Sequence, residues 1–299
     1  MFFYRCFLVD IPHPYNNIGD GPEAPEAKTS ADKLRLKILD KFISSISYDV
    51  RSKIIGQNNL ICPSKIISVR SYGKKILIEL DISVIIITSL GMTGKWQYVS
   101  GNHSHTKLEI SDCDNRGIIK IFKPYCTLFF DDVRYMGSID IIPMANYAFY
   151  FKDLGPDLLE LSLKEETWIS LDTWITIFTG KKHLKKTICE VIMQQELIAG
   201  IGNYLKSEIL YYSGIHPQRI IETINRQEWD TIRKCAHQVI RLAYSYGGFT
   251  IESFLSPDGS LGMYPAAVYG KTYDPNGNLV TRLTTKDGRT SHVVLGLQK

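Results

Sequence analysis

The stretch "LKKTICEVIMQQELIAGIGNYLKSEILYYSG", residues 184–214, carries the strongest fold signal in the sequence. Apolar residues recur at helical spacing on both sides of the glycine-rich segment "AGIGN", and Gly214 ends the second run before Pro217. The pattern predicts one helix over residues 184–197 and a second over 203–213. Two interpretations of the corner stay open: a helix-turn-helix variant whose backbone N–H groups face a phosphate, or a helical hairpin whose glycines only form the corner.

A further helix follows this stretch, and strands precede it. Asn225 and Glu228 form a capping box at the start of a helix that stops at the pair Gly247-Gly248. Between residues 65 and 137, short runs rich in Ile, Val, Phe and Tyr are separated by Gly, Asn and Asp. The runs are "KILIELD", "SVIIITS", "HTKLEIS", "GIIKIFK" and "CTLFFDD". We expect an antiparallel sandwich or barrel in this region.

The change from strands to helices falls near Lys152. Turn sequences at residues 274–277 and 286–288 predict a pair of terminal hairpins. The predicted fold class is α+β, with an N-terminal antiparallel β-sandwich flanked by helices, then a helical domain and the terminal hairpins. The expected segments are an extension at 1–21, a sandwich domain at 22–152, a helical domain at 153–264 and the hairpin segment at 265–299.

Composition narrows the class of protein. A chain of 299 residues that is 44% hydrophobic can bury two cores, and a net charge of +4 does not by itself demand nucleic acid. Six scattered cysteines without a C-x-x-C pair argue against a zinc site and against a secreted disulfide framework. The apolar run at residues 82–92 is too short to span a bilayer, and residues 1–21 do not fit a secretory signal. We expect an intracellular protein without a membrane segment.

The segment from Pro22 to about Ser45 is predicted to be a helix, because its apolar residues recur at helical spacing and Pro and Glu occupy the first turn. Glu23 and Glu26 lie in that turn, and Lys74 precedes a strand. Taken alone, these three charges fit ordinary charge complementarity at a helix end and a surface lysine.

Two further side chains lie on turns. Met92, between glycines in "GMTGKWQY", is either an apolar wedge for a base stack or a core residue. Arg289 lies at the second turn of the terminal hairpins. Its guanidinium either grips a phosphate or is an ordinary surface charge.

In this order the motifs resemble the formamidopyrimidine-DNA glycosylase and endonuclease VIII family. The similarity runs from Pro22 to Gln298. It is carried by "PEAPEA" (22–27), "YGKKILIEL" (72–80), "LGMTGKW" (90–96), "FFDDVRYMG" (129–137), "DLGPDLL" (153–159), "MQQELIAGIGNYLKSEIL" (193–210), "GGFTIESFLSPDGSLGMY" (247–264) and "VYGK…DGRTSH…Q" (268–298). The resemblance implies a helix-two-turn-helix domain in the helical part and a DNA-repair enzyme of base excision repair.

The implied activity is removal of oxidised bases followed by cleavage of the abasic site by β,δ-elimination. By position, Pro22 would be the amine nucleophile on the sugar C1′, with Glu23 as proton donor and acceptor and Glu26 as its support. A terminal amine suits this task, because about 10 to 20% of it is neutral at pH 7, against roughly one lysine in 2,500.

The resemblance also implies how DNA is held. Lys74, Asn203 and Arg289 would bind phosphates of the damaged strand. Met92 would fill the space left by the everted base. Arg134, followed by Tyr135 where many relatives have a second arginine, would contact the opposite strand.

The sequence departs from the family at the nucleophile. Pro22 follows Gly21, so its nitrogen is an amide without a lone pair to offer. Either the working chain begins at Pro22, or a lysine such as Lys28 or Lys74 serves as a weaker lyase nucleophile. The alternative is a catalytically silent DNA-binding relative.

Zinc-bearing relatives close their finger with two C-x-x-C pairs, but no cysteine follows Cys235 here, and Val294 and Leu297 occupy the place of the second pair. The finger therefore resembles the zincless branch, which favours oxidised pyrimidines and hydantoins over 8-oxoguanine, and no metal or cofactor is expected. Ala24 in place of Gly and Met136 in place of Phe are smaller departures that alter the loop angle and the wedge.

The expected partner is double-stranded DNA with oxidised bases or abasic sites, with single-stranded DNA as a second substrate, bound by a monomer. The expected location is the nucleus or cytoplasm, or a viral factory or virion for a viral protein. An RNA-binding or ribosome-associated protein with a similar helical turn is a further alternative, and it predicts a preference for RNA over nicked DNA.

Overall fold

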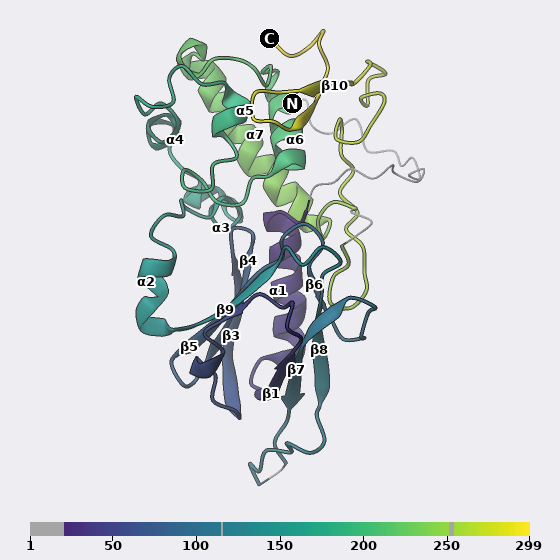
Figure 1. Ribbon diagram of the computed structural model, residues 1–299. Helices are drawn as coiled ribbons and strands as arrows, with labels where there is room; N and C mark the ends of the chain where they lie inside the picture. Colours follow the sequence, from purple (N-terminus) through teal and green to yellow (C-terminus); the bar gives the residue numbers. More distant parts are fainter. Residues whose placement is uncertain (1–20, 115, 251–253) are drawn as a thin grey trace.

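The computed structural model describes residues 21–114, 116–250 and 254–299, and the chain forms two halves stacked end to end (Figure 1). The predicted extension lies outside the described residues, apart from Gly21. The lower half in Figure 1 is built on a β-sheet, and the upper half consists of helices with a small hairpin. The strands are β1 (Phe42–Tyr48), β2 (Ile54–Ile55), β3 (Ser64–Tyr72), β4 (Lys75–Leu80), β5 (Val84–Ser89), β6 (Lys95–Gln97), β7 (Ser104–Ser111), β8 (Cys126–Asp131), β9 (Ser138–Pro143), β10 (Thr281–Thr284) and β11 (Thr290–Val293). The helices are α1 (Ala24–Ile38), α2 (Tyr147–Tyr150), α3 (Leu158–Ser162), α4 (Leu171–Phe178), α5 (Ile188–Val191), α6 (Asn203–Ser213) and α7 (Arg226–Ser245), with 3₁₀ turns at Gln57–Asn59, Met144–Asn146, Glu165–Thr167 and Ile221–Thr223.

The large sheet has the strand order β2-β9-β5-β4-β3-β1-β7-β8-β6. Neighbouring strands run antiparallel except β2 and β9, which are parallel. β1 joins β3 through only two residue pairs, Phe42 with Lys65 and Ile43 with Ser64, and then pairs with β7 along its whole length. This short junction divides the sheet into the two layers of the predicted β-sandwich.

Strands β4 and β5 are covered on both faces. Ile76, Ile78 and Ile86 point into the main buried cluster, whereas Leu77 and Ile87 point to the other face and pack near Phe151. Successive residues of a strand alternate between faces, so an apolar run such as "VIII" requires cover on both sides. The segment around α2 provides the second cover.

Helix α1 connects the two halves. The side chain of Glu26 accepts the backbone N–H of Glu23, and the two residues form a capping box at the helix start. The helix ends at Ile38 and not near Ser45 as predicted. Phe42 satisfies both helical and strand spacing, but Asp40 has a positive φ of 64°, which breaks the helix and turns the chain into β1.

The first helix of the central motif is also shorter than predicted. Instead of residues 184–197, only α5 (Ile188–Val191) is helical. The following backbone is bonded otherwise: the side-chain amide N–H of Gln195 donates to the carbonyl groups of Met193 and Ile201, and its oxygen accepts the N–H of Gly200. α6 and α7 start and end as predicted, with Gly214 and the Asn225 capping box.

The run "GIIKIFK" at residues 117–123 is not a strand, contrary to the prediction. Ile118, Ile121 and Phe122 are exposed, and a single bridge pairs Ile119 with Cys113 in the described part of this loop. An apolar run becomes a strand only where a neighbouring strand or a core receives it. The other four predicted runs correspond to β4, β5, β7 and β8.

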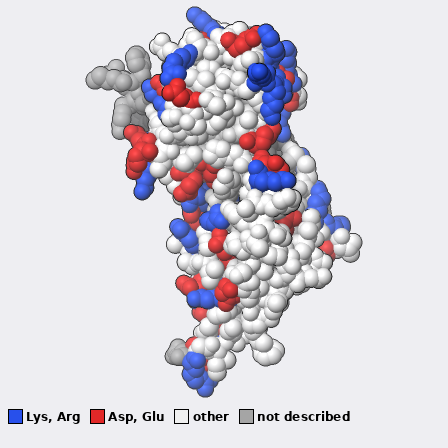
Figure 2. Space-filling model, turned by 90° about the vertical axis from the view of Figure 1, so that its left-hand side faces the viewer, with Lys and Arg blue, Asp and Glu red and all other residues white. Residues whose placement is uncertain are grey.

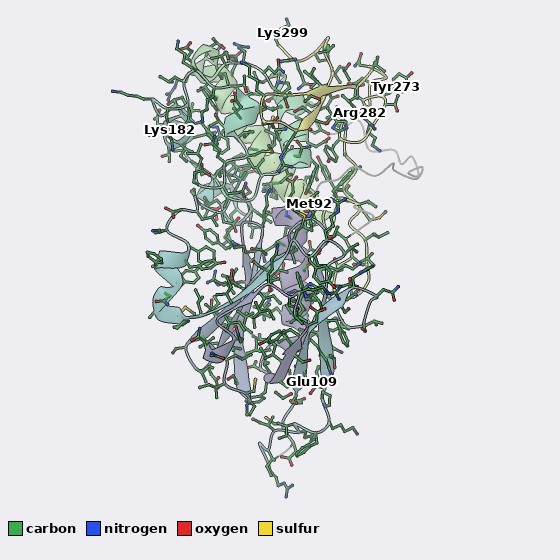
Figure 3. All side chains as sticks on the ribbon, in the orientation of Figure 1. Met92, Glu109, Lys182, Tyr273, Arg282 and Lys299 are labelled. Carbon is green, nitrogen blue, oxygen red and sulfur yellow. The ribbon has the colours of Figure 1, made fainter. Side chains whose placement is uncertain are left out.

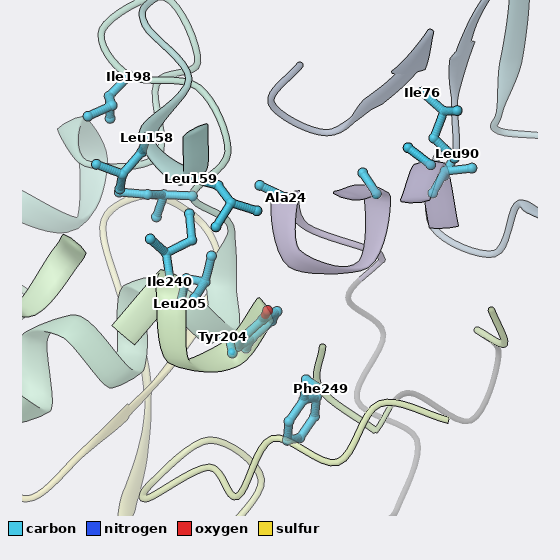
Figure 4. Packing of buried hydrophobic residues seen from close by; sticks show 14 of the residues in the cluster. Ala24, Ile76, Leu90, Leu158, Leu159, Ile198, Tyr204, Leu205, Ile240 and Phe249 are labelled. Atoms are coloured by element: carbon cyan, nitrogen blue, oxygen red, sulfur yellow. The ribbon is translucent and has the colours of Figure 1, made fainter. Parts of the chain in front are cut away.

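One buried cluster runs through both halves. Figure 4 shows Ala24 of α1 beside Leu159 and facing a group of helical residues that includes Ile240, with Ile76 of the sheet on its other side. Ala24 and Ile76 belong to the same cluster as Ile240 of α7. The helix start is therefore fixed from both sides.

Charges of both signs are intermingled on the face shown in Figure 2, and a broad area of its lower half carries neither sign. Within the described ranges, the structure has no helix of the length and apolar character that a membrane span requires.

Candidate active site

A cleft of about 640 Å³ opens where the two halves meet. Figure 3 shows Met92 at this level, between the sheet and the helical half, with Arg282 further up in the hairpin. The cleft is lined by Gly21, Pro22, Glu23, Lys74, Gly91, Met92, Met136, Lys186, Cys189, Glu190, Met193, Gln194, Gln195, Gly202, Lys286, Asp287 and Arg289. Residues from the first helix, the sheet turns, the central helical motif and the hairpin thus share one cavity.

Glu23 is a buried carboxylate held by the central helical motif. Its Oε2 accepts the backbone N–H of Gly202 at 2.6 Å, and its Oε1 accepts that of Tyr204 at 2.9 Å. These donors lie at the N-terminal end of α6, where N–H groups lack helical partners and favour a negative group. The anion at this helix start is therefore a side chain of the protein, and the phosphate-facing interpretation of the corner finds no support at these two N–H groups.

Gly202 is required by close packing. Its φ of −126° is ordinary for any residue, but a Cβ there would lie 2.3 Å from Oε1 of Glu23 and 2.7 Å from Nζ of Lys74. The carboxylate, the ammonium group and the helix start therefore converge on a single point of the backbone.

Glu26 lies behind Glu23 and is fully buried. Its Oε1 accepts the hydroxyl of Tyr204 at 3.0 Å and the N–H of Phe249 at 2.7 Å, while its Oε2 accepts the N–H of Glu23. Burial raises the pKa of Glu26, and the N–H donors oppose the rise. Glu26 does not line the cleft, so it acts on the site by fixing Glu23.

Burial raises the pKa of Glu23 to about 8. The nearby ammonium group of Lys74 opposes this rise, and the Glu26 carboxyl group reinforces it. The two backbone N–H groups oppose it as well. A carboxyl group with such a pKa can hold a proton near neutral pH and then release it, which is what a general acid and base must do.

Lys74 lies on the turn between β3 and β4, and that turn is tied to the helical half. Asp157 accepts the N–H of Gly73 at 2.8 Å through one oxygen and caps α3 through the other. The sequence motif "DLGPDLL" marked the domain entry but gave no indication that Asp157 contacts the lysine turn, because the two segments are 84 residues apart.

The hairpin supplies the opposite wall. Arg289 and Lys286 line the cleft beside Lys186 of the helical half. Asn203 is buried behind this wall, and its side-chain amide donates to the carbonyl group of Thr290 at 3.0 Å. Asn203 thus ties the hairpin to the start of α6.

Met92 and Met136 form an apolar edge of the cleft. Arg134 does not line the cleft, but its Nη1 lies 3.6 Å from the sulfur of Met92. Tyr135 is also outside the lining: its ring stacks on His105 at 4.8 Å, on a backbone with a φ of 50°. From the sequence, Met136 is notable only because it replaces a phenylalanine of the family. In the structure, Met136 is exposed, whereas Met92 is half-buried.

Pro22 is buried at the mouth of α1, with its nitrogen bonded to Gly21. Gly21 packs tightly on the Met92 loop: a Cβ there would lie 2.4 Å from the carbonyl oxygen of Gly91 and 2.5 Å from the Cα of Met92. Gly21 itself therefore forms part of the cleft wall.

No metal centre is built from the described residues, in which no three His, Cys, Asp or Glu side chains gather closely enough to hold an ion. The five cysteines of the described part, Cys62, Cys113, Cys126, Cys189 and Cys235, are free thiols. Because the chain has no cysteine after Cys235, its hairpin does not fit a cysteine-bound zinc ion.

The β-sandwich, the helix-turn-helix segment and the terminal hairpin thus surround one cleft. A family model described as the formamidopyrimidine-DNA glycosylase N-terminal domain matches residues 21–139, and one for the H2TH domain of the same enzyme matches residues 170–254. The two matches together cover more than two thirds of the chain, which belongs to the formamidopyrimidine-DNA glycosylase family of base excision repair.

Individual relatives agree with this assignment. A formamidopyrimidine-DNA glycosylase of Wolbachia pipientis is 27% identical over 282 residues, 91% of this chain and 97% of that protein, and one of Streptococcus pyogenes is 28% identical over 295 residues, 93% and 98%. The MutM (Fpg) protein of Thermus thermophilus has a similar fold, with a TM-score of 0.79 at 23% identity over 93% of this chain and 98% of that one. The Lactococcus lactis Fpg bound to DNA with an abasic site matches equally, with a TM-score of 0.79 at 22% identity over 93% of this chain and all of that one.

Proposed function

We propose that this protein, once its chain begins at Pro22, is a bifunctional DNA glycosylase and abasic-site lyase that removes oxidised bases. The proposal rests on one observation: Pro22, Glu23, Lys74 and Arg289 line the same cleft. A reactive nitrogen, a proton-transferring carboxyl group and two cations are the groups that base excision through an amine nucleophile requires.

In the proposed reaction, a free Pro22 nitrogen attacks C1′ of the sugar, the bond between C1′ and the base breaks, and the proton that the amine loses neutralises the departing base anion. Glu23 gives a proton to the ring oxygen as the ribose opens, leaving a cationic iminium between Pro22 and C1′. The iminium withdraws electrons from C2′, whose proton passes to the Glu23 carboxylate as the C3′–O bond breaks and the 3′-phosphate leaves. A second elimination breaks the C5′–O bond and releases the 5′-phosphate. The raised pKa of Glu23 supports its role as the proton donor near neutral pH.

The remaining candidates are proposed to hold the DNA. Lys74, Asn203 and Arg289 would bind phosphates of the damaged strand, and the bond from Asn203 to Thr290 would also hold the finger that carries Arg289. Met92 and Met136 would fill the space of the flipped base, because they form the apolar edge of the cleft.

Arg134 and Tyr135 are proposed to contact the DNA strand opposite the lesion. Contact between Arg134 and Met92 supports that position for the arginine. Stacking of Tyr135 on His105 supports a bracing function for the tyrosine ring.

A catalytically silent DNA-binding protein is the alternative. It is favoured by the Gly21–Pro22 peptide bond, which removes the nucleophile and brings Gly21 into the cleft wall. A lysine that serves as a weaker lyase nucleophile is the further alternative: Lys74 lines the cleft, whereas Lys28 lies outside the lining and is paired with Asp32 at 2.7 Å.

Borohydride trapping separates the two functions. Two chains are compared on a duplex with an abasic site: one begins at Pro22, and the other is the full 299-residue chain, in which the Pro22 nitrogen is an amide. We expect a covalent adduct with DNA only for the chain that begins at Pro22. Equal binding without an adduct from either chain would support the silent alternative, and equal trapping by both would assign the nucleophile to another amine.

The lesion preference is proposed from the metal-free finger. Duplexes carrying an oxidised pyrimidine or a hydantoin should be cleaved faster than a duplex carrying 8-oxoguanine. Single-turnover rates on the three duplexes, and on single-stranded versions, measure this directly. A fastest rate on 8-oxoguanine would contradict the proposal.

We also propose that the sandwich domain ends at Lys152 and the helical domain near residue 264. The protein is proposed to bind DNA as a monomer. The relatives named above are bacterial proteins, which lends no support to a nuclear or viral location. An intracellular site of action follows from the proposed substrate.

A further inference from the structure

Lys206 is a fully buried cation in the middle of the helix α6. Its ammonium group lies 2.6 Å from a carboxylate oxygen of Asp287, which is itself only 6% exposed. A buried charge is costly unless it is paired and hydrogen-bonded, so the buried ammonium group of Lys206 needs the Asp287 carboxylate beside it. It joins the helix to the turn of the hairpin finger.

The same carboxylate organises the tip of the finger. Its other oxygen, Oδ1, accepts the hydroxyl of Thr285 at 2.6 Å and the backbone N–H of Arg289 at 3.2 Å. Thr285 in turn donates its N–H to the carbonyl group of Arg289 at 3.0 Å. Asp287 therefore connects the buried lysine directly to the backbone of the arginine that lines the cleft.

A second tie lies one helical turn earlier on the same face of α6, where Asn203 bonds to the carbonyl group of Thr290. Two attachments on one rigid helix hold both ends of the arginine segment. In a finger without cysteine ligands, side-chain contacts have to supply this attachment.

We infer that Lys206 is a positioning residue, which acts through Asp287 to aim Arg289 at the DNA backbone. The inference deepens the proposed function, on which it rests for the contact between Arg289 and phosphate. Lys206 itself is closed to solvent and does not line the cleft.

The test measures affinity for a duplex with a tetrahydrofuran abasic-site analogue, using chains that begin at Pro22. Lys206→Met should weaken binding about tenfold, close to the effect of Arg289→Ala, because one charge-assisted contact is lost in each case. In the Arg289→Ala background, Lys206→Met should add almost nothing. Lys234→Met is the control, because it removes an equal charge and an ion pair with Asp230 on α7 while leaving the finger untouched.

A second variant separates positioning from folding. Replacing the pair together, as Lys206→Met with Asp287→Leu, should restore thermal stability, because two apolar side chains can fill a buried ion-pair site. Binding should stay about tenfold weaker, since Arg289 has lost its carboxylate anchor. Parental affinity in this double variant would overturn the inference about Lys206 but not the proposed function of Arg289. Additive effects of Lys206→Met and Arg289→Ala would do the same. Parental affinity in Arg289→Ala would overturn both the inference and the proposed function of that arginine.

Discussion

Glu23 is a carboxyl group that the fold holds in a dry site although it costs free energy when ionised. Its pKa is raised from 4.5 to about 8, mainly by burial. Between these values the folded protein keeps the proton that the unfolded chain has lost. The same raised pKa that would suit Glu23 to proton transfer thus makes the protein less stable as the pH rises.

The pH dependence of stability tests this property. Since the folded state binds more protons than the unfolded state between pH 4.5 and about 8, the contribution of Glu23 is fully present below pH 4.5 and is lost as the pH rises toward 8. One proton corresponds to about 1.4 kcal/mol per pH unit. The free energy of unfolding, measured with urea at pH 5.5, 6.5 and 7.5, should fall less steeply with pH in Glu23→Gln than in the parent. The two slopes should differ by up to about 1.4 kcal/mol per pH unit. Identical slopes for the two proteins would show that Glu23 titrates normally.

Gly202 allows the closest approach in the site. A Cβ there would meet the Glu23 carboxylate, which cannot move aside because it accepts N–H bonds from Gly202 and Tyr204. Gly202→Ala should therefore lower the free energy of unfolding by about 1–3 kcal/mol and abolish most borohydride trapping. The matched change Gly296→Ala, where a Cβ meets nothing within 4 Å, should alter neither. Full trapping by Gly202→Ala would mean that the site tolerates a displaced carboxylate.

At the scale of elements, the β3–β4 turn and the helix α3 are joined by one side chain, Asp157. Asp157→Asn keeps the oxygen that caps α3 but places an N–H donor against the N–H of Gly73, so the turn that carries Lys74 should loosen. We expect abasic-duplex affinity to fall roughly threefold to tenfold, because part of one phosphate contact is lost.

The matched comparison for Asp157 is another helix cap. Asn225→Ala removes the cap of α7 and should cost about 1 kcal/mol of stability without weakening DNA binding. If both variants lost stability and affinity in parallel, Asp157 would be a cap and nothing more.

The sequence predicted those elements whose limits depend on local chemistry. Capping boxes at Glu23 and Asn225 and the glycine after Ser213 mark helix ends that local bonding enforces. The end of α1 depends on a distant segment, since β1 needs β7 as a partner. Helix α5 is short because the side chain of Gln195, a few residues later, takes up backbone groups of the following turn. The spacing of apolar residues does not show that other hydrogen-bond partners compete with the helix for its backbone groups.

The candidate site divides in the same way. Proximity of Pro22, Glu23 and Glu26 follows from one helix turn, whereas their approach to Lys74 and Gly202 joins segments far apart in the chain. Only the resemblance to a family brought those residues into one hypothesis. Asp157 and Lys206 act through buried tertiary contacts, and no local pattern pointed to either.

For the whole molecule, the cleft needs both halves, because Lys74 and Met92 come from the sheet and Lys186, Lys286 and Arg289 from the helical half and finger. Bound DNA would therefore lie across the junction and contact each half. Helix α1 packs against both the sheet and α7, so it fixes the cleft residues of the two halves relative to one another.

The net charge of only +4 makes salt dependence a sharp test of this arrangement. Each phosphate contact should contribute about 0.9 to the slope of log K against log salt concentration. Lys74→Met from one half and Arg289→Met from the other should each reduce the slope by about one, and the double variant by about two, in titrations with the abasic-site analogue between 50 and 300 mM salt. Lys185→Met, which loses an exposed lysine paired with Glu222, should leave the slope unchanged. A slope that responds to variants of one half only would place the DNA on that half and contradict binding across the cleft.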